Sequence, residues 1–203
     1  CIEENLYEGK LRKIDPNAEE LPEWTTPVFV VDQDAKGLLG RLVCAYGLVN
    51  AAMEVPSFPS ADPVRAFEMA AGKKHHSLVD AIWGYTQFLL DESTKKLLVL
   101  CTRSGLYEWL RMPFGPAPAP AEMQSYVASK FGSLVNSRGE PIVAPCMDDL
   151  KLSSATFAEH IDYVNRLNRE ARKEGFEFKL KKGQFKQPEI EFWGCILSGE
   201  GRR

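Results

Sequence analysis

An acidic pair between two apolar runs is the sequence feature that most constrains this fold. The runs Pro141–Pro145 and Leu150–Ser153 flank Met147-Asp148-Asp149. Two β-prone runs separated by a few turn-forming residues predict a hairpin of antiparallel strands. The sequence therefore predicts an antiparallel sheet that carries two carboxylates at one hairpin tip.

The remaining elements extend this sheet into an α+β plan. Helical spacing of apolar residues predicts helices over Ala121–Val135 and from Phe157 to a stop at Gly175. Other strands and short helices are expected at 27–32, 42–46, 64–71, 77–80, 96–102, 106–112, 176–178 and 190–197, after an irregular lead-in over 1–26. Antiparallel strands with helices packed on one face form an α+β fold.

Composition excludes several classes of protein. The chain has 203 residues, of which 44% are hydrophobic and 26% charged, enough for one domain or two small lobes and too apolar for disorder. No apolar run reaches about 18 residues, so no membrane partner is expected. Five widely spaced cysteines without Cys-x-x-Cys spacing predict neither a zinc site nor a disulfide framework. We expect an intracellular, reducing compartment, with cytoplasm and nucleus both open, and a piece of a longer protein, because Cys1 stands in place of an initiator Met.

Charge is unevenly distributed along the chain. The net charge is −3, but residues 101–203 hold 15 basic and 13 acidic residues, against 10 and 15 in residues 1–100. A basic stripe lies within 166–186, at Arg166, Arg169, Arg172, Lys173, Lys179, Lys181, Lys182 and Lys186. Such a stripe binds phosphates or forms a solvated helix face, and charge alone favours the solvated face.

Three carboxylates form the main candidate site. Asp80 ends an apolar strand, and Asp148-Asp149 lies at the hairpin tip. If these strands are neighbours, the three carboxylates converge at one sheet edge, where hard oxygen ligands suit Mg²⁺. Two Mg²⁺ ions would there assist a phosphoryl displacement.

Each part of this site also has an ordinary structural explanation. An Asp pair at a turn usually serves the turn itself. The pair His75-His76 is more often one exposed and one packed side chain than a set of ligands. The sequence shows no legible Ser/His/Asp arrangement and no glycine-rich phosphate loop.

Seven blocks in order resemble the reverse transcriptases of gypsy-class long-terminal-repeat retrotransposons. Gly105–Gly115 carries the most distinctive resemblance, and the match extends over about residues 21–198. The other blocks are Pro27–Asn50, Asp80 followed by Gly84-Tyr85-Thr86-Gln87, Ala119-Pro120-Ala121 with Gln124, Cys146-Met147-Asp148-Asp149, Lys181-Lys182 with Phe185, and Phe192-Trp193-Gly194.

This resemblance implies an RNA-directed DNA polymerase that joins a deoxynucleoside triphosphate to a primer 3′-hydroxyl on an RNA or DNA template. Asp80, Asp148 and Asp149 would hold two Mg²⁺ ions, with Mn²⁺ as a substitute. Lys182, or alternatively Lys181, would protonate the leaving pyrophosphate. The nucleotide would contact Arg41, Tyr85 and Gln124, with Tyr85 sensing the sugar 2′ position. Phe192, Trp193 and Gly194 would form the primer grip.

The resemblance also implies a domain plan of fingers and palm without a thumb. Residues 1–54 and 91–121 would form the fingers, and 55–90 and 122–203 the palm. The chain departs from the family in the first finger motif, where Ala45-Tyr46-Gly47 lacks both usual charges. Cys146, Pro116 and Pro118 also replace the usual residues, whereas the three carboxylates are retained.

Two hypotheses of different classes follow. Retained carboxylates favour an active polymerase. The acidic chain and the lost finger charges favour a retroelement-derived protein kept as a structural or protein-binding subunit of a larger assembly, with weak or no catalysis.

The implied role of Tyr85 makes a prediction about sugar selection. A bulky ring beside the ribose excludes a 2′-hydroxyl by sterics. We therefore expect Tyr85→Ala to raise ribonucleotide incorporation relative to deoxyribonucleotide incorporation in primer extension, while Tyr85→Phe keeps the preference. An active Tyr85→Ala variant with unchanged sugar preference would contradict the assignment.

Overall fold

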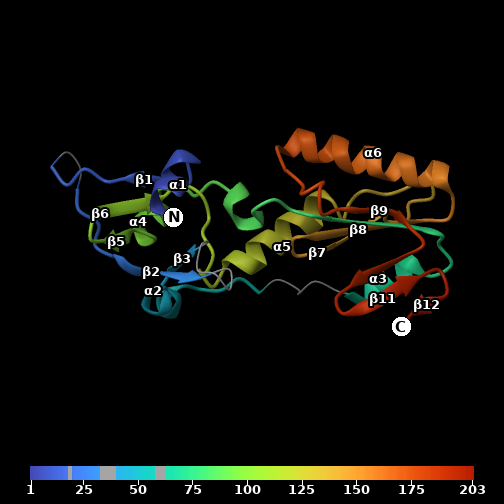
Figure 1. Ribbon diagram of the computed structural model, residues 1–203, viewed down its shortest axis with the longest axis horizontal. Coiled ribbons are helices and arrows are strands. Elements are labelled where there is room, and N and C mark those ends of the chain that lie inside the picture. The colour runs from blue at the N-terminus through green and yellow to red at the C-terminus, as the bar shows by residue number, and fades with distance from the viewer. Residues whose placement is uncertain (18–19, 33–39, 58–62) are drawn as a thin grey trace. The chain divides into compact units, whose positions relative to one another are not determined.

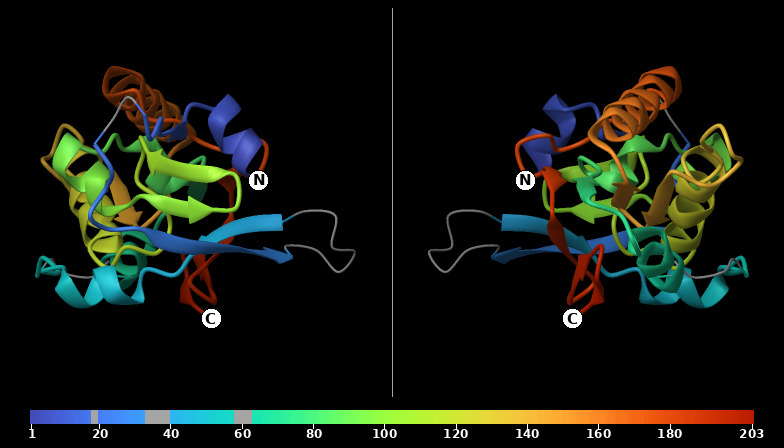
Figure 2. Two further views of the ribbon diagram at one scale, coloured as in Figure 1. Left: turned by 90° about the vertical axis from the view of Figure 1, so that its left-hand side faces the viewer. Right: turned by 90° about the vertical axis from the view of Figure 1, so that its right-hand side faces the viewer.

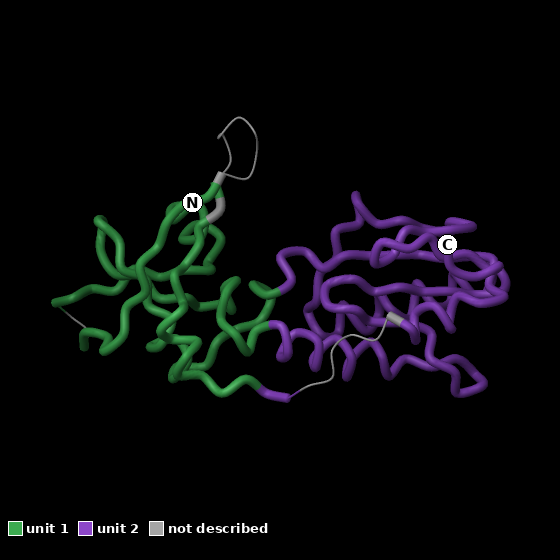
Figure 3. Tube along the Cα trace, turned by 90° about the horizontal axis from the view of Figure 1, so that it is seen from below, with its two compact units in different colours: residues 1–55, 85–119 green, residues 56–84, 120–203 purple. Residues whose placement is uncertain are grey.

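The computed structural model describes every residue of the chain except 18–19, 33–39 and 58–62 (Figure 1). It divides into two compact units (Figure 3). Unit 1 comprises Cys1–Val55 and Tyr85–Ala119, and unit 2 comprises Pro56–Gly84 and Pro120–Arg203. The boundaries expected for fingers and palm lie at 54/55, 90/91 and 121/122, and the assignment of those two names to residues remains a prediction.

Unit 1 is built on a five-stranded sheet in the order β1-β6-β5-β2-β3. Its strands are β1 (Leu11–Lys13), β2 (Thr26–Asp32), β3 (Gly40–Cys44), β5 (Leu100–Thr102) and β6 (Gly105–Trp109). Only Thr26 and Pro27 of β2 pair with β5, in parallel. Beyond them β2 and β3 continue as a two-stranded ribbon (Figure 2). The hairpins predicted for these strands are confirmed.

The short helices of unit 1 correct two expectations from the sequence. They are α1 (Ile2–Tyr7), α2 (Gly47–Ala52) and α4 (Glu92–Leu97). The irregular lead-in expected over 1–26 was wrong, because α1 and β1 lie within it and β1 pairs with β6. The strand expected from Lys96 was also wrong at its start. Asp91 caps α4 there by accepting hydrogen bonds from the amides of Ser93 and Thr94, both at 3.0 Å.

Unit 2 is built on a four-stranded antiparallel sheet in the order β7-β8-β4-β9. Its strands are β4 (His75–Asp80), β7 (Val143–Cys146), β8 (Asp149–Ser154) and β9 (Gln184–Gln187). The predicted hairpin around Asp148 is confirmed as β7 and β8. The strand expected at 176–178 contributes only one bridge, Phe178 to Ala81, and the fourth strand lies further along the chain.

Helix α6 (Phe157–Glu174) covers one face of this sheet (Figure 1). Thr156 and Glu159 form a capping box at its start, and Gly175 ends it in the left-handed conformation (φ 66°). His160 of α6 is buried against the sheet and hydrogen-bonds Ser77 Oγ at 2.7 Å and Ser154 Oγ at 2.9 Å. Helix α5 (Ala119–Lys130) precedes β7. Phe131, just after α5, packs with Phe176 and Phe178, just after α6, in one aromatic cluster.

The opposite face of the sheet carries α3 (Pro63–Ala70) and a small three-stranded sheet. That sheet consists of β10 (Glu189–Phe192), β11 (Cys195–Ser198) and β12 (Gly201–Arg202). Both pack on β7 through one apolar cluster, whose buried members are Ala66, Ala70, Ala144, Cys146, Ile190, Phe192 and Leu197. No helix in the described part of the chain is long and apolar enough to cross a bilayer.

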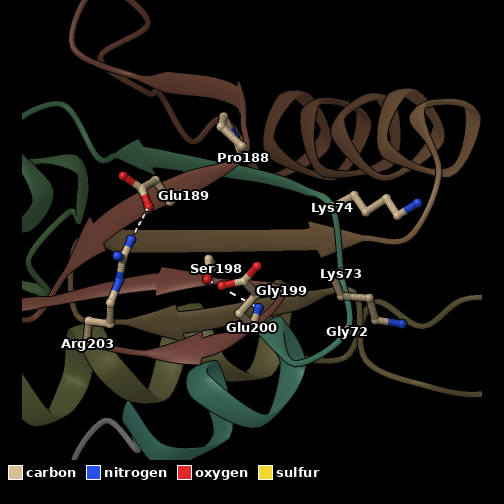
Figure 4. Close-up of a pocket in the computed structure, with 9 residues that line it drawn as sticks. All are labelled: Gly72, Lys73, Lys74, Pro188, Glu189, Ser198, Gly199, Glu200 and Arg203. Atoms are coloured by element: carbon tan, nitrogen blue, oxygen red, sulfur yellow. Dashed lines mark hydrogen bonds and ion pairs between the residues drawn. The ribbon is translucent and has the colours of Figure 1, made fainter.

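A backbone contact fixes one end of the small sheet to the loop before β4. The Gly72 amide donates to the Gly199 carbonyl at 2.9 Å. A Cβ at residue 199 would collide with the carbonyl oxygen of Lys73, so this close approach requires glycine. A cavity of about 550 Å³ lies beside the contact (Figure 4). Arg203 and Glu189 form a 2.7 Å ion pair at its wall.

Polar side chains are buried between the sheet and α3. His76 and Ser153 are opposite each other on β4 and β8, and His76 Nδ1 lies 2.9 Å from Ser153 Oγ. Lys151 Nζ donates to the Ala66 carbonyl at 2.9 Å and to Ser153 Oγ at 2.8 Å. Burial, and then the charge of Lys151, lower the pKa of His76 to about 4. Burial alone lowers the pKa of Lys151 to about 8.

This cluster predicts that stability falls in mild acid. An unfolded histidine binds a proton near pH 6.5, whereas folded His76 does so near pH 4. Its contribution is therefore complete above pH 6.5 and is lost as the pH falls toward 4, by about 3 kcal/mol in total. We expect His76→Gln to remove that part of the pH dependence in urea unfolding measured between pH 7 and pH 4.5. His160 is present in both proteins and cancels in the comparison, and an unchanged pH slope would contradict the role of His76.

Candidate active site

Two of the three candidate carboxylates face each other across neighbouring strands. Asp80, the last residue of β4, is the register partner of Asp149, the first residue of β8. Directly opposite residues in an antiparallel pair project to the same face of the sheet. Lys151, two residues beyond Asp149, lies on the face covered by α3, so the carboxylates also belong to that face. A side-chain hydrogen bond joins Asp149 to Asp80.

The electrostatics of this pair follow from crowding. Burial, the hydrogen bond to Asp80 and the charges of Asp148 and Asp80 raise the pKa of Asp149 to about 7. Ionisation of Asp149 is therefore unfavourable, because its charge would be partly buried beside two other carboxylates. A cation placed between them removes the same repulsion.

Asp148 lies in a tight turn that is stabilised by a hydrogen bond from its backbone to helix α5. Met147 and Asp148 connect β7 to β8, and Met147 has a positive φ of 58°. A positive φ at the first turn residue is the pattern of a type II′ hairpin turn, normally formed by glycine. The Met147 amide donates to Gln124 Oε1 at 2.7 Å, and the Gln124 side chain is buried in α5. Gln124 therefore positions the turn that carries Asp148.

The donor chemistry of this site fits a hard divalent cation. Every candidate ligand is a carboxylate oxygen, the kind that Mg²⁺ prefers. Asp80 and Asp149 are already in contact, while Asp148 is exposed beside them, with its carbonyl accepting from the Ala81 amide at 2.8 Å. Among the residues that the structure describes, no three or more His, Cys, Asp or Glu side chains are arranged to hold a metal ion. The structure thus brings together a carboxylate pair with a third carboxylate on the adjoining turn.

Backbone hydrogen bonds connect the strand end at Asp80 to the segment after α6. The Lys179 amide donates to the Asp80 carbonyl at 2.8 Å, and the Ile82 amide donates to the Glu177 carbonyl at 3.0 Å. Lys182 follows on a turn closed by its amide donating to the Lys179 carbonyl at 3.1 Å, and its side chain is exposed. The turn that carries Lys182 therefore starts at the carboxylate strand.

The three residues of the expected primer grip have different environments. Phe192 is buried in the apolar cluster under the small sheet. Trp193 and Gly194 both have positive φ, 51° and 70°, and form the tight turn between β10 and β11. Trp193 is 50% exposed, so it is the member of the three that presents a ring to solvent.

Two of the residues expected to contact the nucleotide, Arg41 and Tyr85, belong to unit 1. Arg41 pairs with Val31 in the β2–β3 ribbon, and its side chain lies outside the described part of the structure. The Tyr85 ring packs edge-on against Phe114, with centroids 5.0 Å apart.

The positioning role of Gln124 was missed from the sequence. Gln124, Val127 and Phe131 follow a helical spacing and are all buried. A polar residue on a buried helix stripe needs a partner, and this signal was available in the pattern. The partner itself, a turn amide 23 residues later, was not predictable from spacing.

Crowding at Asp149 predicts a stability gain when its charge is removed. The folded pKa is raised, so the ionised site loses stability as the pH rises from about 4 to 7. We expect Asp149→Asn to raise the melting temperature in EDTA at pH 8 by roughly 2–8 °C, corresponding to roughly 1–2 kcal/mol after discounting for solvent exposure. The gain should disappear near pH 4 and shrink when Mg²⁺ is added to the parent. A variant that melts at or below the parent temperature at pH 8 would contradict the crowding.

Comparison with known proteins identifies relatives of this chain. Residues 32–197 match the family described as reverse transcriptase (RNA-dependent DNA polymerase). The uncharacterized protein K02A2.6 of Caenorhabditis elegans is 30% identical over 185 residues, which covers 89% of this chain and 14% of that protein. The retrovirus-related Pol polyprotein from transposon 297 of Drosophila melanogaster is 27% identical over 207 residues, which covers 98% of this chain and 18% of the polyprotein. The chain therefore spans less than a fifth of either relative.

Solved structures share the fold at low identity. A foamy viral protease-reverse transcriptase in complex with an RNA/DNA hybrid has a TM-score of 0.82 and 20% identity, covering 99% of this chain and 25% of that chain. The dRH form in complex with double-stranded DNA has a TM-score of 0.83 and 21% identity, covering 99% and 33%. These likenesses confirm the predicted α+β fold of fingers and palm. With the family match spanning most of the sequence, they show that the chain belongs to the reverse transcriptase family.

Proposed function

We propose that this chain is the catalytic region of an RNA-directed DNA polymerase from a gypsy-class long-terminal-repeat retrotransposon. The observation that carries the proposal is the register of β4 and β8, which sets Asp80 against Asp149 with Asp148 on the adjoining turn. The similarity to the transposon 297 polyprotein supports a retroelement origin.

The proposed reaction is in-line attack of a primer 3′-hydroxyl on the α-phosphate of a deoxynucleoside triphosphate. Asp80, Asp148 and Asp149 would hold two Mg²⁺ ions. When bound, these ions supply charge neutralisation at the transferred phosphate and lower the pKa of the attacking hydroxyl. Gln124 keeps the Asp148 turn in its strained form, so the carboxylates are ordered before substrate arrives.

The other site residues bind and orient the substrates in this proposal. Lys182 holds a proton on Nζ for the leaving pyrophosphate. Arg41 binds the triphosphate, and Tyr85 excludes the 2′-hydroxyl. Trp193 packs on the primer end from the exposed turn of the small sheet.

We also propose an RNA or DNA template–primer as the nucleic-acid partner. The foamy viral relatives of the same fold were solved with an RNA/DNA hybrid and with double-stranded DNA. Two of the eight residues of the basic stripe are engaged by acids, which reduces the set of phosphate contacts that the stripe offers. Arg166 pairs with Asp162 at 3.8 Å, and Lys173 pairs with Glu170 at 2.9 Å. The two ion pairs therefore lower both the expected affinity and the steepness of its salt dependence, since each lost phosphate contact removes about 0.9 from the slope.

Primer extension and nucleotide-dependent binding test this function together. We expect the chain to extend a primer with Mg²⁺ or Mn²⁺, and its affinity for labelled primer–template to rise when the matched deoxynucleotide is added. Asp148→Asn should abolish the gain in affinity and reduce extension by roughly 10²-fold or more, since a charged group at the reacting phosphate is lost. Glu200→Gln is the control for loss of a surface charge, because Glu200 is an exposed acid in the turn between β11 and β12, outside both the carboxylate site and the basic stripe.

The result that overturns the proposal is equally specific. If the folded chain shows neither extension nor a nucleotide-dependent gain in affinity on RNA and DNA templates, the polymerase function is wrong. The protein-binding subunit is then the better hypothesis, and a tight protein partner should be sought.

A further inference from the structure

A cavity of about 670 Å³ lies within unit 1, away from every residue that the proposed mechanism uses. This cavity, the α4 pocket, is lined by residues of α4, of β1 and of the segment 20–24 that leads into β2. Volumes from about 300 to about 1,000 Å³ are typical of ligand-binding sites in proteins. The pocket is therefore large enough to take several side chains of a partner.

Three exposed apolar side chains converge on the α4 pocket. Leu21, Trp24 and Leu97 line it with 59%, 46% and 39% of their surfaces exposed, together with the buried side chains of Ile14 and Val99. Single exposed apolar residues are ordinary on protein surfaces, whereas several around one hollow mark an interaction site. The free energy of burying these side chains is available only to a partner that fills the pocket.

Ion pairs neutralise part of the charge that lines the α4 pocket. Arg12 Nε donates to Glu108 Oε1 at 2.7 Å. Lys95 Nζ lies 2.6 Å from Glu92 Oε1 on α4. Because opposite charges at these distances offset each other, the net charge of the pocket is set by its other lining residues.

Those other residues leave an excess of negative charge. Among the residues that the structure describes, Glu20 and Glu23 have no ion-pair partner, and Lys96 is the one lining cation in the same condition. Unit 1 as a whole holds 13 acidic and nine basic residues, a net charge of −4, whereas unit 2 holds 15 acidic and 16 basic residues. A phosphate backbone is therefore repelled at this surface, and a cationic partner is attracted.

We propose that the α4 pocket is a docking site for a basic segment of a partner protein, in which aliphatic side chains alternate with lysine or arginine. The aliphatic side chains of that segment pack on Leu21 and Leu97. Its cationic groups pair with Glu20 and Glu23, and the exposed ring of Trp24 offers the same cations an aromatic face. Apolar contacts supply affinity, and the acids select a cationic sequence. This site does not depend on the proposed polymerase function.

A pair of labelled peptides tests the charge preference of the pocket. The probe is a short fluorescein-labelled peptide of alternating leucine and lysine, and its counterpart has glutamate in place of each lysine. We expect fluorescence polarisation to show at least roughly 10-fold tighter binding of the lysine peptide, because like charges across an interface cost affinity. Added salt should weaken that binding. Equal affinities for the two peptides would overturn the proposal.

Substitution of the two unpaired acids tests whether the peptide binds in the pocket. The double variant Glu20→Gln, Glu23→Gln should weaken binding of the lysine peptide by roughly 2- to 30-fold, the effect of losing two exposed ion pairs. The matched control is Glu3→Gln, Glu4→Gln, which removes the same charge from exposed acids on α1 that do not line the pocket. Equal losses in the two double variants would show binding to general negative charge and overturn the site.

Truncation of the exposed indole tests the apolar part of the pocket. Trp24→Ala should weaken binding by roughly 10-fold or more, as truncation of a central aromatic anchor does. Trp193→Ala, which removes an equally exposed tryptophan from unit 2, should bind the peptide as the parent does. If Trp24→Ala melts before binding can be measured, the double glutamine variant still decides the question, because both of its side chains are exposed.

Other occupants of the pocket give different results. Competition between primer–template and the lysine peptide would make the pocket a nucleic-acid site. Self-association of the chain in sedimentation velocity that is lost in Trp24→Ala would make the occupant a second copy. Either result would overturn the proposal. Trp24→Ala should extend primers at the parent rate, so the docking site and the polymerase function are tested by separate measurements.

Discussion

The antiparallel pairing of β4 with β8 is the interaction on which the rest of unit 2 depends. Six consecutive residue pairs join these strands, from His75 with Ser154 to Asp80 with Asp149. The register determines which side chains lie on each of the two faces of the sheet. One alternating set faces α3 and ends in the carboxylates, and the other contains Ser77 and Ser154, which bind His160 of α6. A slip of the pairing by one residue would exchange the two sets between the faces. The carboxylate pair would be lost, together with the buried hydrogen bonds around Lys151 and around His160.

Several features that lower the stability of the folded protein lie close to the carboxylates. Like charges crowd at Asp149, Met147 and Trp83 hold positive φ values, and a lysine and a histidine are buried on the same strands. Stabilising apolar contacts that offset these costs lie outside the site. They are the apolar cluster between β7, α3 and the small sheet, and the aromatic cluster of Phe131, Phe176 and Phe178. Functional sites are typically destabilising in this way, and the stability of the fold comes from packing elsewhere.

Long periodic elements were predictable from the sequence, and short ones were not. Helix α6 combines an apolar stripe, a capping box and a terminal glycine, so several local signals agree. Strand β1 has three residues and exists because β6 pairs with it, a contact 96 residues apart that leaves no local pattern. At the site, the acidic hairpin was legible from flanking apolar runs, whereas the support from Gln124 and the conformation of Trp83 depend on tertiary contacts and backbone angles. The rest of the site assignment came from family resemblance, and residue roles stay predictions.

The glycine contact at Gly199 has a mechanical consequence for the exposed turn at Trp193. Strands β10 and β11 have four residues each, so roughly 13 Å of stiff ribbon separates the anchored end from the free turn. The small sheet is held at this end by the backbone contact with Lys73 and along its length by Ile190, Phe192 and Leu197, which are buried in the apolar cluster on β7. The exposed ring of Trp193 is thus aligned from two places, the backbone contact at Gly199 and the buried side chain of the adjacent Phe192.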